Sequence, residues 1–242
     1  MRGSGSRARG WLLPAVERAG RENLDPTHVA RYDAKMPFPI EAELEVLRKS
    51  GLCESSVVVD LGAGTGQFAI GAASGCRNLT AVEVAPAMLA ALRRNVSMAG
   101  VTNVTVVDSG FLSYEPGEPA DFAYSRHALH HLPDFWKAVA LQRIHELLRP
   151  GGCFRLWDLV YSFDPVEATS RVEDWCARAD AGGDVETEWI RSELEDHVRE
   201  EHSTFTWLLE PMLERVGFDV AEAVYSPDGF EAKYLLRRSG SS

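Results

Sequence analysis

A glycine-rich turn directly after an unbroken apolar run constrains the fold of this chain most. Residues 56–60 read Ser-Val-Val-Val-Asp, as expected for a central strand that is covered on both faces. Gly62, Gly64 and Gly66 follow at alternate positions, and helix signals begin after Gly66. Backbone N–H groups and a helix N-terminus can meet a polar ligand closely here, because no large side chain blocks the approach. The segment therefore predicts a cofactor cradle.

The sequence beyond this turn alternates short β-branched runs with helical patterns, which is typical of βαβ units and a parallel sheet. Helical periodicity covers residues 86–100 and 134–148. The expected strands are 56–60, 79–84, 104–108, 121–124 and 153–160, with a terminal hairpin of 218–224 and 230–236. The sequence therefore predicts an α/β fold with a Rossmann-like, seven-stranded, mostly parallel sheet, an antiparallel C-terminal hairpin and helical caps.

Two segments stand outside this alternation. Residues 11–51 contain helical stretches before the first strand, and residues 161–203 separate the fifth strand from the last helix. Both are too long for plain loops, so each is expected to form a helical cap over the carboxyl edge of the sheet. The second begins a helix at a capping-box pattern, Ser192-Glu193-Leu194-Glu195. We therefore predict a disordered N-terminus at residues 1–10 and a main domain at residues 52–242 that contains the insert 161–203.

Composition argues against several classes of function. A net charge of −11 disfavours a broad phosphate-binding surface, so nucleic acid is not an expected partner. The four cysteines lie far apart, without the CxxC spacing of a zinc site, and fit a reducing compartment. No apolar run reaches the length of about 20 residues that a membrane span needs, and the start does not resemble a signal peptide. We expect a cytoplasmic protein with no membrane span, and we assign no metal ligands.

The spacing of the glycines separates two classes of cofactor. A dinucleotide-binding fingerprint needs Gly-x-Gly-x-x-Gly, and here Gln67 stands at the position of its third glycine. The segment from Asp60 to Gly66, Asp-Leu-Gly-Ala-Gly-Thr-Gly, closely resembles motif I of the class I S-adenosylmethionine-dependent methyltransferases. A nicotinamide-dependent oxidoreductase is the alternative, although the chain has no apparent Tyr-x-x-x-Lys pair to favour it.

Later segments repeat this resemblance in the same order along the chain. Acidic residues, Glu83 and Asp108, end the second and third expected strands. Residues 121–132 resemble the family's fourth motif with its His-His-Leu extension, and residues 149–152 resemble the frequent turn before the fifth strand. The resemblance covers residues 53–160 and is to the small-molecule group, which includes enzymes of ubiquinone and menaquinone biosynthesis and of natural-product tailoring.

The resemblance implies S-adenosylmethionine as the cofactor and a set of residues that bind it. In the family, the acid at the position of Glu83 accepts both ribose hydroxyls, and the residue at Val84 packs on the adenine. The polar residue at the position of Asp108 binds the adenine amino group. The implied cofactor-binding residues are Asp60, Gly62, Ala63, Gly64, Thr65, Gly66, Glu83, Val84, Met88, Asp108, Ser109, Gly110, Phe111, Ser125 and Arg126.

Methyl transfer from a sulfonium is a direct displacement, so the protein mainly aligns the acceptor and excludes water. An acceptor that begins as a hydroxyl or an acidic carbon can need a base, for which histidine is suited. His130 and His131 follow the fourth strand, next to the expected position of the methyl group, and are the predicted catalytic residues. The alternative role for His131 is to order this loop through hydrogen bonds.

Recognition of the acceptor is expected from the caps. Tyr32 begins a Tyr-Asp segment that resembles one which many small-molecule methyltransferases fold over the cofactor. Asp158 and Tyr161, at the end of the fifth strand, are the other predicted substrate-binding residues, and the insert adds the aromatic residues Trp175 and Trp189. The expected partner is a small-molecule acceptor, with a homodimer as the assembly considered. A cofactor-binding protein without turnover is a further alternative, and the sequence leaves open whether O, N, C or S is methylated.

Overall fold

The computed structural model describes residues 11, 13–14, 19–36, 38–180 and 190–240. The predicted disordered N-terminus, residues 1–10, lies outside the described residues, as does Trp189 of the insert. No helix in the described part of the chain is both long and apolar enough to cross a membrane.

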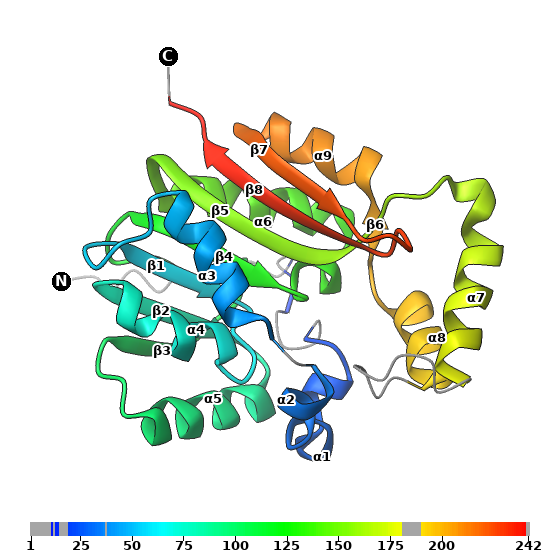
Figure 1. Ribbon diagram of the computed structural model, residues 1–242, viewed down its shortest axis with the longest axis horizontal. Coiled ribbons are helices and arrows are strands. Elements are labelled where there is room, and N and C mark those ends of the chain that lie inside the picture. Colours follow the sequence, from blue (N-terminus) through cyan, green and yellow to red (C-terminus); the bar gives the residue numbers. More distant parts are fainter. Residues whose placement is uncertain (1–10, 12, 15–18, 37, 181–189, 241–242) are drawn as a thin grey trace.

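A mixed sheet forms the centre of the molecule (Figure 1). Its main strands are β1 Val57–Leu61, β2 Asn78–Glu83, β3 Val104–Asp108, β4 Ala120–Arg126, β5 Leu148–Tyr161, β7 Phe218–Tyr225 and β8 Glu231–Arg238. They follow the order β3-β2-β1-β4-β5-β8-β7, in which β1 to β5 are parallel and β8 is antiparallel to both of its neighbours. The predicted sheet and hairpin are confirmed. A two-residue eighth strand, β6 Thr204–Phe205, pairs with β5 and was not predicted.

Strands β4 and β5 are longer than predicted. Ser125 and Arg126 continue the parallel pairing with β5, opposite Leu156 and Trp157, so they are strand residues rather than the start of a loop. β5 begins before the expected turn at residues 149–152, and the pairing shifts register near its start. The longer β4 places Arg126 at the carboxyl end of the sheet.

The side chains of β1 alternate between two buried clusters, as expected for a strand that is covered on both faces. Val57, Val59 and Leu61 pack in a cluster with α6 and α9. Val58 packs in the other, with α3, α4 and α5. The bounds of these helices are α3 Ile40–Lys49, α4 Gln67–Ala72, α5 Pro86–Ala99, α6 Asp134–Leu147 and α9 Thr206–Arg215.

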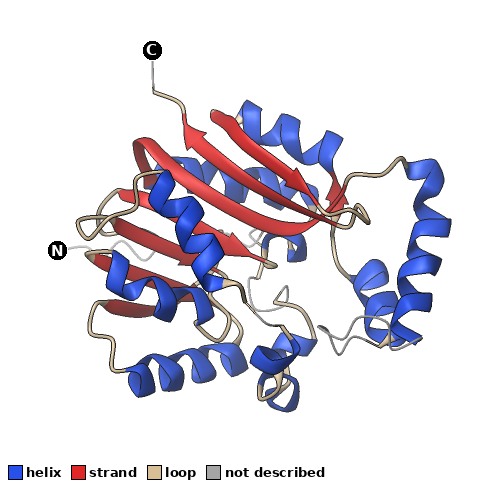
Figure 2. Ribbon diagram, in the orientation of Figure 1, coloured by secondary structure: helices blue, strands red, loops and turns tan. Residues whose placement is uncertain are grey.

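Two further groups of helices lie beyond the carboxyl ends of the parallel strands (Figure 2). The N-terminal cap contains α1 Pro26–Val29 and α2 Tyr32–Lys35, and the insert contains α7 Ala168–Asp180 and α8 Arg191–Glu200. Single 3-10 turns occur at Glu22–Leu24, Ala73–Gly75, Leu129–His131 and Pro165–Glu167. The two caps are joined by an ion pair, because the buried Lys35 Nζ lies 2.6 Å from Glu193 Oε2.

The predicted capping box of the insert is displaced by two residues. Helix α8 begins at Arg191, so Ser192 lies within its first turn and does not precede it. Instead the Ile190 N–H donates a hydrogen bond of 3.2 Å to Glu193 Oε2. The carboxylate of Glu193 therefore both caps α8 and holds Lys35 of the other cap.

A buried ion pair attaches α3 to β5. Arg155 donates two hydrogen bonds to Glu43, from Nε at 2.8 Å and from Nη2 at 2.9 Å, and both side chains are 3% exposed. Bidentate geometry of this kind compensates for the loss of hydration of both charges.

Replacing Arg155 by Met should lower the free energy of unfolding by about 3–5 kcal/mol, because Glu43 would remain as an uncompensated buried charge. Lys233 Nζ, 3.9 Å from Glu43 Oε1, cannot replace two hydrogen bonds. Chemical denaturation measures the change. Arg171→Met is the control, since its pair with Glu167 is about half exposed, and it should cost less than about 1 kcal/mol. Equal losses in the two variants would contradict the prediction.

Candidate functional site

The turn between β1 and α4 has the backbone of a ligand cradle. Gly62 and Gly64 adopt left-handed conformations, with φ of 74° and 55°. A Cβ on Gly62 would lie 2.4 Å from the Cβ of Ala128, so only glycine fits there. A Cβ on Gly64 would meet no atom within 4 Å, because the Gly64 backbone borders open space. The turn is thus packed on one side and open on the other.

Asp60 lies just before this turn, at the end of a buried strand. Its side chain is buried, and no hydrogen bond reaches its Oδ2 from the described residues. Burial, and then the nearby charge of Glu83, raise the pKa of Asp60 well above its usual range. A buried carboxylate oxygen without a donor fits a ligand that brings a positive group to the cradle.

Glu83 joins the end of β2 to the same turn. Its Oε2 accepts a hydrogen bond from the Gly64 N–H at 2.8 Å, and its Oε1 accepts from the N–H groups of Val84 and Ala85. Burial raises the pKa of Glu83, against the effect of these three donors. Asp108 pairs in register with Glu83 at the end of β3. The two predicted acids therefore lie on neighbouring strand ends, beside the cradle.

The other predicted cofactor residues surround these strand ends. Val84 and Met88 pack in a small cluster with the N-terminal cap, in which Met88 is only 3% exposed. The Ser109 N–H donates to the Glu83 carbonyl at 3.2 Å, and the ring of Phe111 lies close to Gly62. The structure thus brings residues 108–111 to the cradle, and their contacts with the cofactor stay predictions.

Arg126 lies at the cradle and is held between two aromatic rings. Its guanidinium carbon is 4.8 Å from the ring centre of Phe38 and 4.6 Å from that of Trp157. Gln67 stands at the position of the third glycine of a dinucleotide-binding fingerprint. Its Oε1 accepts a hydrogen bond of 3.4 Å from Arg126 Nη1. Ser125, by contrast, is fully buried behind Arg126 in β4.

A pocket that we call the cradle cavity opens between these residues and the N-terminal cap. It is lined by Tyr32, Phe38, Asp60, Gly62, Ala63, Gly64, Thr65, Gln67, Phe68, Tyr124 and Arg126. The Thr65 hydroxyl donates a short hydrogen bond to the carboxylate of Asp33. The Tyr32-Asp33 segment thus covers the cradle.

A second pocket, the inner cavity, lies under both caps and shares Tyr32 with the cradle cavity. The N-terminal cap, the insert and the loop after β4 all contribute to its wall, which includes Asn23, Tyr32, Met36, His130, His131, Trp175, Leu194, His197 and Glu201. The wall is therefore assembled from segments that lie far apart in the sequence.

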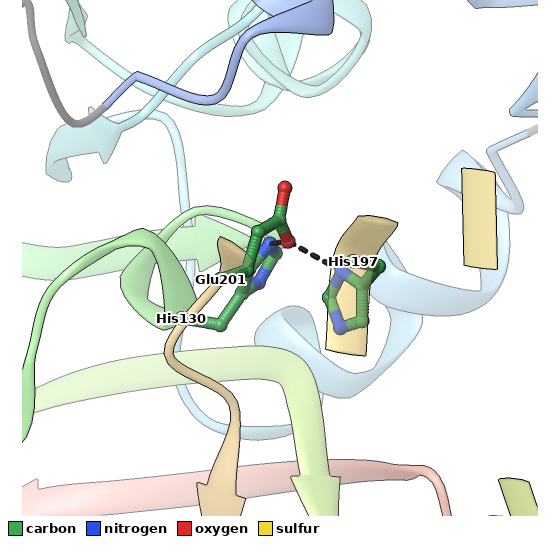
Figure 3. A group of neighbouring side chains, drawn as sticks. All are labelled: His130, His197 and Glu201. Carbon is green, nitrogen blue, oxygen red and sulfur yellow. Dashed lines mark ion pairs between the residues drawn. The ribbon is translucent and has the colours of Figure 1, made fainter. Parts of the chain in front are cut away.

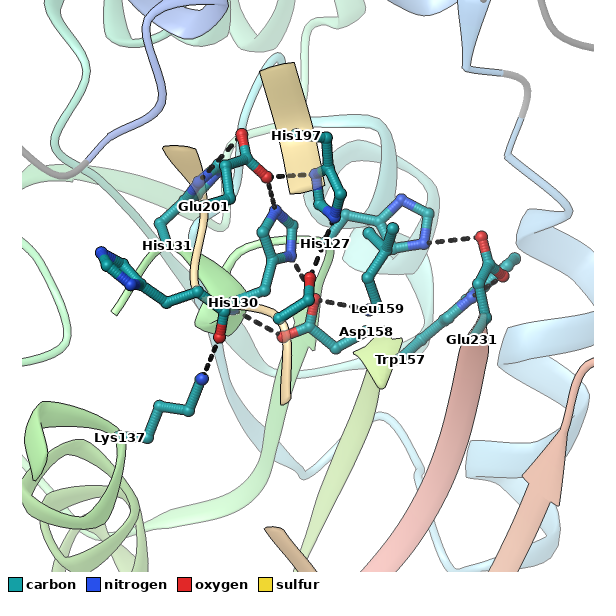
Figure 4. A network of polar contacts seen from close by, with 12 residues as sticks. His127, His130, His131, Lys137, Trp157, Asp158, Leu159, His197, Glu201 and Glu231 are labelled. Carbon is teal, nitrogen blue, oxygen red and sulfur yellow. Dashed lines mark hydrogen bonds and ion pairs between the residues drawn. The ribbon is translucent and has the colours of Figure 1, made fainter. Parts of the chain in front are cut away.

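His130 is held between two carboxylates at this wall (Figures 3 and 4). Its Nδ1 lies 2.5 Å from Asp158 Oδ1, and its Nε2 lies 3.0 Å from Glu201 Oε2. The His130 N–H also donates to Asp158 Oδ2 at 2.9 Å. Burial acts to lower the pKa of His130, but the two carboxylates outweigh it and raise the pKa to about 10.

His131 has a different environment from its neighbour. Its Nε2 lies 3.3 Å from the side-chain amide nitrogen of Asn23, and its Nδ1 lies 3.6 Å from Glu201 Oε1. Burial and the charge of His130 lower the pKa of His131 to about 3, so the ring is neutral. A neutral Nε2 accepts from an amide N–H, which fits the contact with Asn23.

The predicted substrate-binding residues separate into two groups. Tyr32 lines both cavities. Asp158, only 1% exposed, directs both carboxylate oxygens to His130, and Tyr161 packs against the rings of Phe163 and Phe205. Burial raises the pKa of Tyr161 to about 12. Contact of Asp158 or Tyr161 with an acceptor stays a prediction, and the structure assigns both residues to contacts within the protein.

Sequence reasoning missed the role of Glu201 at this site and gave His197 no particular partner. Glu201 Oε2 forms a short ion pair with His197 Nδ1, and His197 Nε2 lies 2.9 Å from Ser203 Oγ. The available signal was the spacing of four residues between His197 and Glu201, which places two side chains one helical turn apart.

Comparison with known proteins shows which proteins this chain resembles. Residues 58–152 match a protein family described as a methyltransferase domain. This part of the chain, less than half of its length, is therefore similar to a methyltransferase domain. An uncharacterized methyltransferase of Geobacillus kaustophilus is 29% identical over 136 residues, which are 55% of this chain. The match spans 61% of that relative's length.

Solved structures share the overall fold of this chain. A phosphoethanolamine N-methyltransferase of Haemonchus contortus, solved with phosphomonomethylethanolamine and S-adenosylhomocysteine, matches 95% of this chain and 61% of its own, with 16% identity and a TM-score of 0.69. The N-methyltransferase NodS of Bradyrhizobium japonicum, solved with S-adenosylhomocysteine, matches 92% of this chain and 97% of its own, with 18% identity and a TM-score of 0.61. The shared architecture is the class I methyltransferase fold.

The cofactor that this domain implies is S-adenosylmethionine, and the cradle fits it. The Gly64 backbone borders open space, which allows a ligand to approach. Asp60 offers an unpaired oxygen to a positive group such as the cofactor's ammonium. Glu83 and Asp108 stand on adjacent strand ends, where hydroxyl and amino groups need acceptors.

Replacing Gly64 by Ala should weaken the binding of S-adenosylhomocysteine at least tenfold, because the new methyl group projects into the ligand side of the cradle. Calorimetric titration measures the affinity. Gly100→Ala is the matched control, since Gly100 also has a left-handed φ, 66°, and open space around it, but lies at the end of α5. Both variants should lose about 1–2 kcal/mol of stability from the strained backbone. An equal effect of both variants on affinity would contradict the assignment of the cradle.

Proposed function

We propose that the protein transfers a methyl group from S-adenosylmethionine to a small-molecule acceptor that binds in the inner cavity. The observation that carries this proposal is the shared wall of the two pockets, since Tyr32 lines both. A donor in the cradle cavity and an acceptor in the inner cavity would meet beside this ring. Both caps enclose the inner cavity, which suits a small acceptor better than a polymer.

When bound, S-adenosylmethionine supplies an electrophilic methyl group on its sulfonium. In our proposal Asp60 and the Gly62–Gly66 turn hold its methionyl part, and Glu83 with Asp108 hold the ribose and adenine. Tyr32 and Asp33 close the cradle from above, which excludes water from the reacting atoms. The contribution of the chain is alignment and enclosure rather than a covalent step.

The contacts of the two histidines bear on which of them can act as the predicted base. Both ring nitrogens of His130 face carboxylates, so this side chain has no free nitrogen to offer to an acceptor. His131 lines the inner cavity and is the remaining candidate of the pair. We propose that His131 orders the loop against Asn23, because a pKa of about 3 makes its ring a weak base. The alternative, that it takes the acceptor's proton, is distinguished by its replacement.

The net charge of −11 and the enclosed cavity support a small acceptor over nucleic acid. The structure of the cradle disfavours the alternative of a nicotinamide-dependent oxidoreductase. Gln67 stands where a dinucleotide-binding turn needs glycine, and its side chain contacts Arg126. A cofactor-binding protein without turnover is the remaining competitor, which an assay of methyl transfer tests.

The first test titrates the full chain with S-adenosylhomocysteine and, separately, with NAD⁺ and NADH. We expect one equivalent of S-adenosylhomocysteine to bind and neither nicotinamide to bind. Radiolabelled S-adenosylmethionine is then supplied with a panel of small hydroxyl, amine and thiol acceptors. Binding of a nicotinamide without S-adenosylhomocysteine would overturn the proposal.

The same assay examines His131→Ala, with turnover and cofactor affinity measured separately. If His131 takes the acceptor's proton, turnover falls by the factor of about 10²–10⁴ that a base contributes, while the affinity for S-adenosylhomocysteine changes little. His145→Ala, a histidine against Phe218 on the far side of the sheet, is the control and should change neither quantity. Unchanged turnover in His131→Ala would leave this residue only the role of ordering the loop.

A further inference from the structure

Three side chains from two segments, each able to ligate a metal ion, lie together at the wall of the inner cavity (Figure 3). Their ligating atoms are His130 Nε2 from the turn after β4, His197 Nδ1 from α8 and Glu201 Oε2 from just after α8, and all lie within 4.8 Å of one another. The exposed fractions of the three side chains are 4%, 9% and 10%. None of them has a part in holding the methyl donor in the proposed function.

The second nitrogen of each imidazole ring is held by another group. His130 Nδ1 lies 2.5 Å from the carboxylate of Asp158 (Figure 4). His197 Nε2 lies 2.9 Å from the hydroxyl of Ser203. Histidines that bind metals almost always have such a partner, which fixes the tautomer and turns the other nitrogen toward the ion. Here both partners turn the remaining nitrogens toward the same oxygen, Glu201 Oε2.

Glu201 Oε2 is the common partner of the two imidazole rings. It lies 3.0 Å from His130 Nε2 and also contacts His197 Nδ1, and these contacts are ion pairs when the rings carry protons. A divalent ion would take the place of these protons, because imidazole and carboxylate groups bind a metal through their lone pairs. The three ligating atoms are close enough together to share one ion.

We propose that His130, His197 and Glu201 bind one divalent transition-metal ion at the wall of the inner cavity. Two imidazole nitrogens and one carboxylate oxygen form a donor set that suits Zn²⁺ and leaves at least one coordination position open. Glu22 and His131 form a second such group with Glu201, within the same 4.8 Å limit. Asp158 and Ser203 act as positioning residues.

The metal site is inferred from geometry alone, whereas its role in catalysis rests on the proposed function. An ion at this wall would bind an acceptor oxygen, nitrogen or sulfur and lower its pKa, so that the acceptor meets the methyl donor as a better nucleophile. The inference thus names an acceptor class: small molecules that carry a metal-binding hydroxyl, thiol or amine group.

The test titrates the full chain, free of affinity tags and treated with a chelator, with Zn²⁺ in a calorimeter, and with Co²⁺ while its visible absorption is recorded. We expect one equivalent to bind the wild-type protein. Glu201→Gln and His197→Gln should each weaken binding at least a hundredfold, and Asp158→Asn by about 10–100-fold because it acts through His130. Zn²⁺ should also raise the Tm of the wild-type protein and not that of Glu201→Gln.

His28→Gln is the matched control, because His28 lines the same cavity but does not belong to the ligand set. It should leave the affinity for Zn²⁺ unchanged. Far-UV circular dichroism and titration with S-adenosylhomocysteine show that each variant is folded, and the latter tests the donor site independently of the metal. The inference is overturned if Zn²⁺ does not bind the wild-type protein, or if it binds Glu201→Gln and His197→Gln as tightly as the wild type.

Discussion

The buried chain of charges from Asp158 through His130 to Glu201 fixes how the caps meet the sheet. Asp158 lies near the end of β5, His130 follows β4 and Glu201 follows α8, so three separate segments meet through one imidazole ring. Charges buried to this extent are tolerated only when each has close partners. Removing any one of them would leave the others uncompensated. The position of the insert therefore depends on these three buried charged side chains.

Further contacts of the same loop extend the attachment. The His202 N–H donates to the carbonyl of His130 at 3.0 Å, and Lys137 of α6 donates to the carbonyl of His202. On the other side, Lys35 holds Glu193 across the two caps. The inner cavity thus has a wall of polar contacts that couple α6, the insert and the N-terminal cap.

The sheet and the cradle could be predicted from the sequence because their signals are local. Residues 57–61 form a strand buried on both faces, and the glycines that follow carry the conformations that the turn needs. Glu83 and Asp108 could be placed because parallel strands end at one edge of a sheet. The length of β4 was underestimated, since only its pairing with β5 shows that Arg126 is still in the strand.

The wall of the inner cavity could not be predicted in the same way. His130 and Glu201 are 71 residues apart in the sequence, and no periodicity relates them. The contact exists because the insert folds back over the strand ends, which is a tertiary event. For the same reason the sequence could not show that the carboxylate of Asp158 is directed at His130. The capping box at Ser192 failed on a smaller scale, because Glu193 caps the helix from within its first turn.

The account's central claim is that the methyl donor binds in the cradle beneath the N-terminal cap. Hydrogen–deuterium exchange with and without S-adenosylhomocysteine tests this claim most directly. The account predicts slower exchange in two segments together, residues 61–66 of the cradle and residues 32–36 of the cap, with little change in β7 and β8. Protection that leaves both segments unchanged, or that falls on β7 and β8 instead, would contradict it.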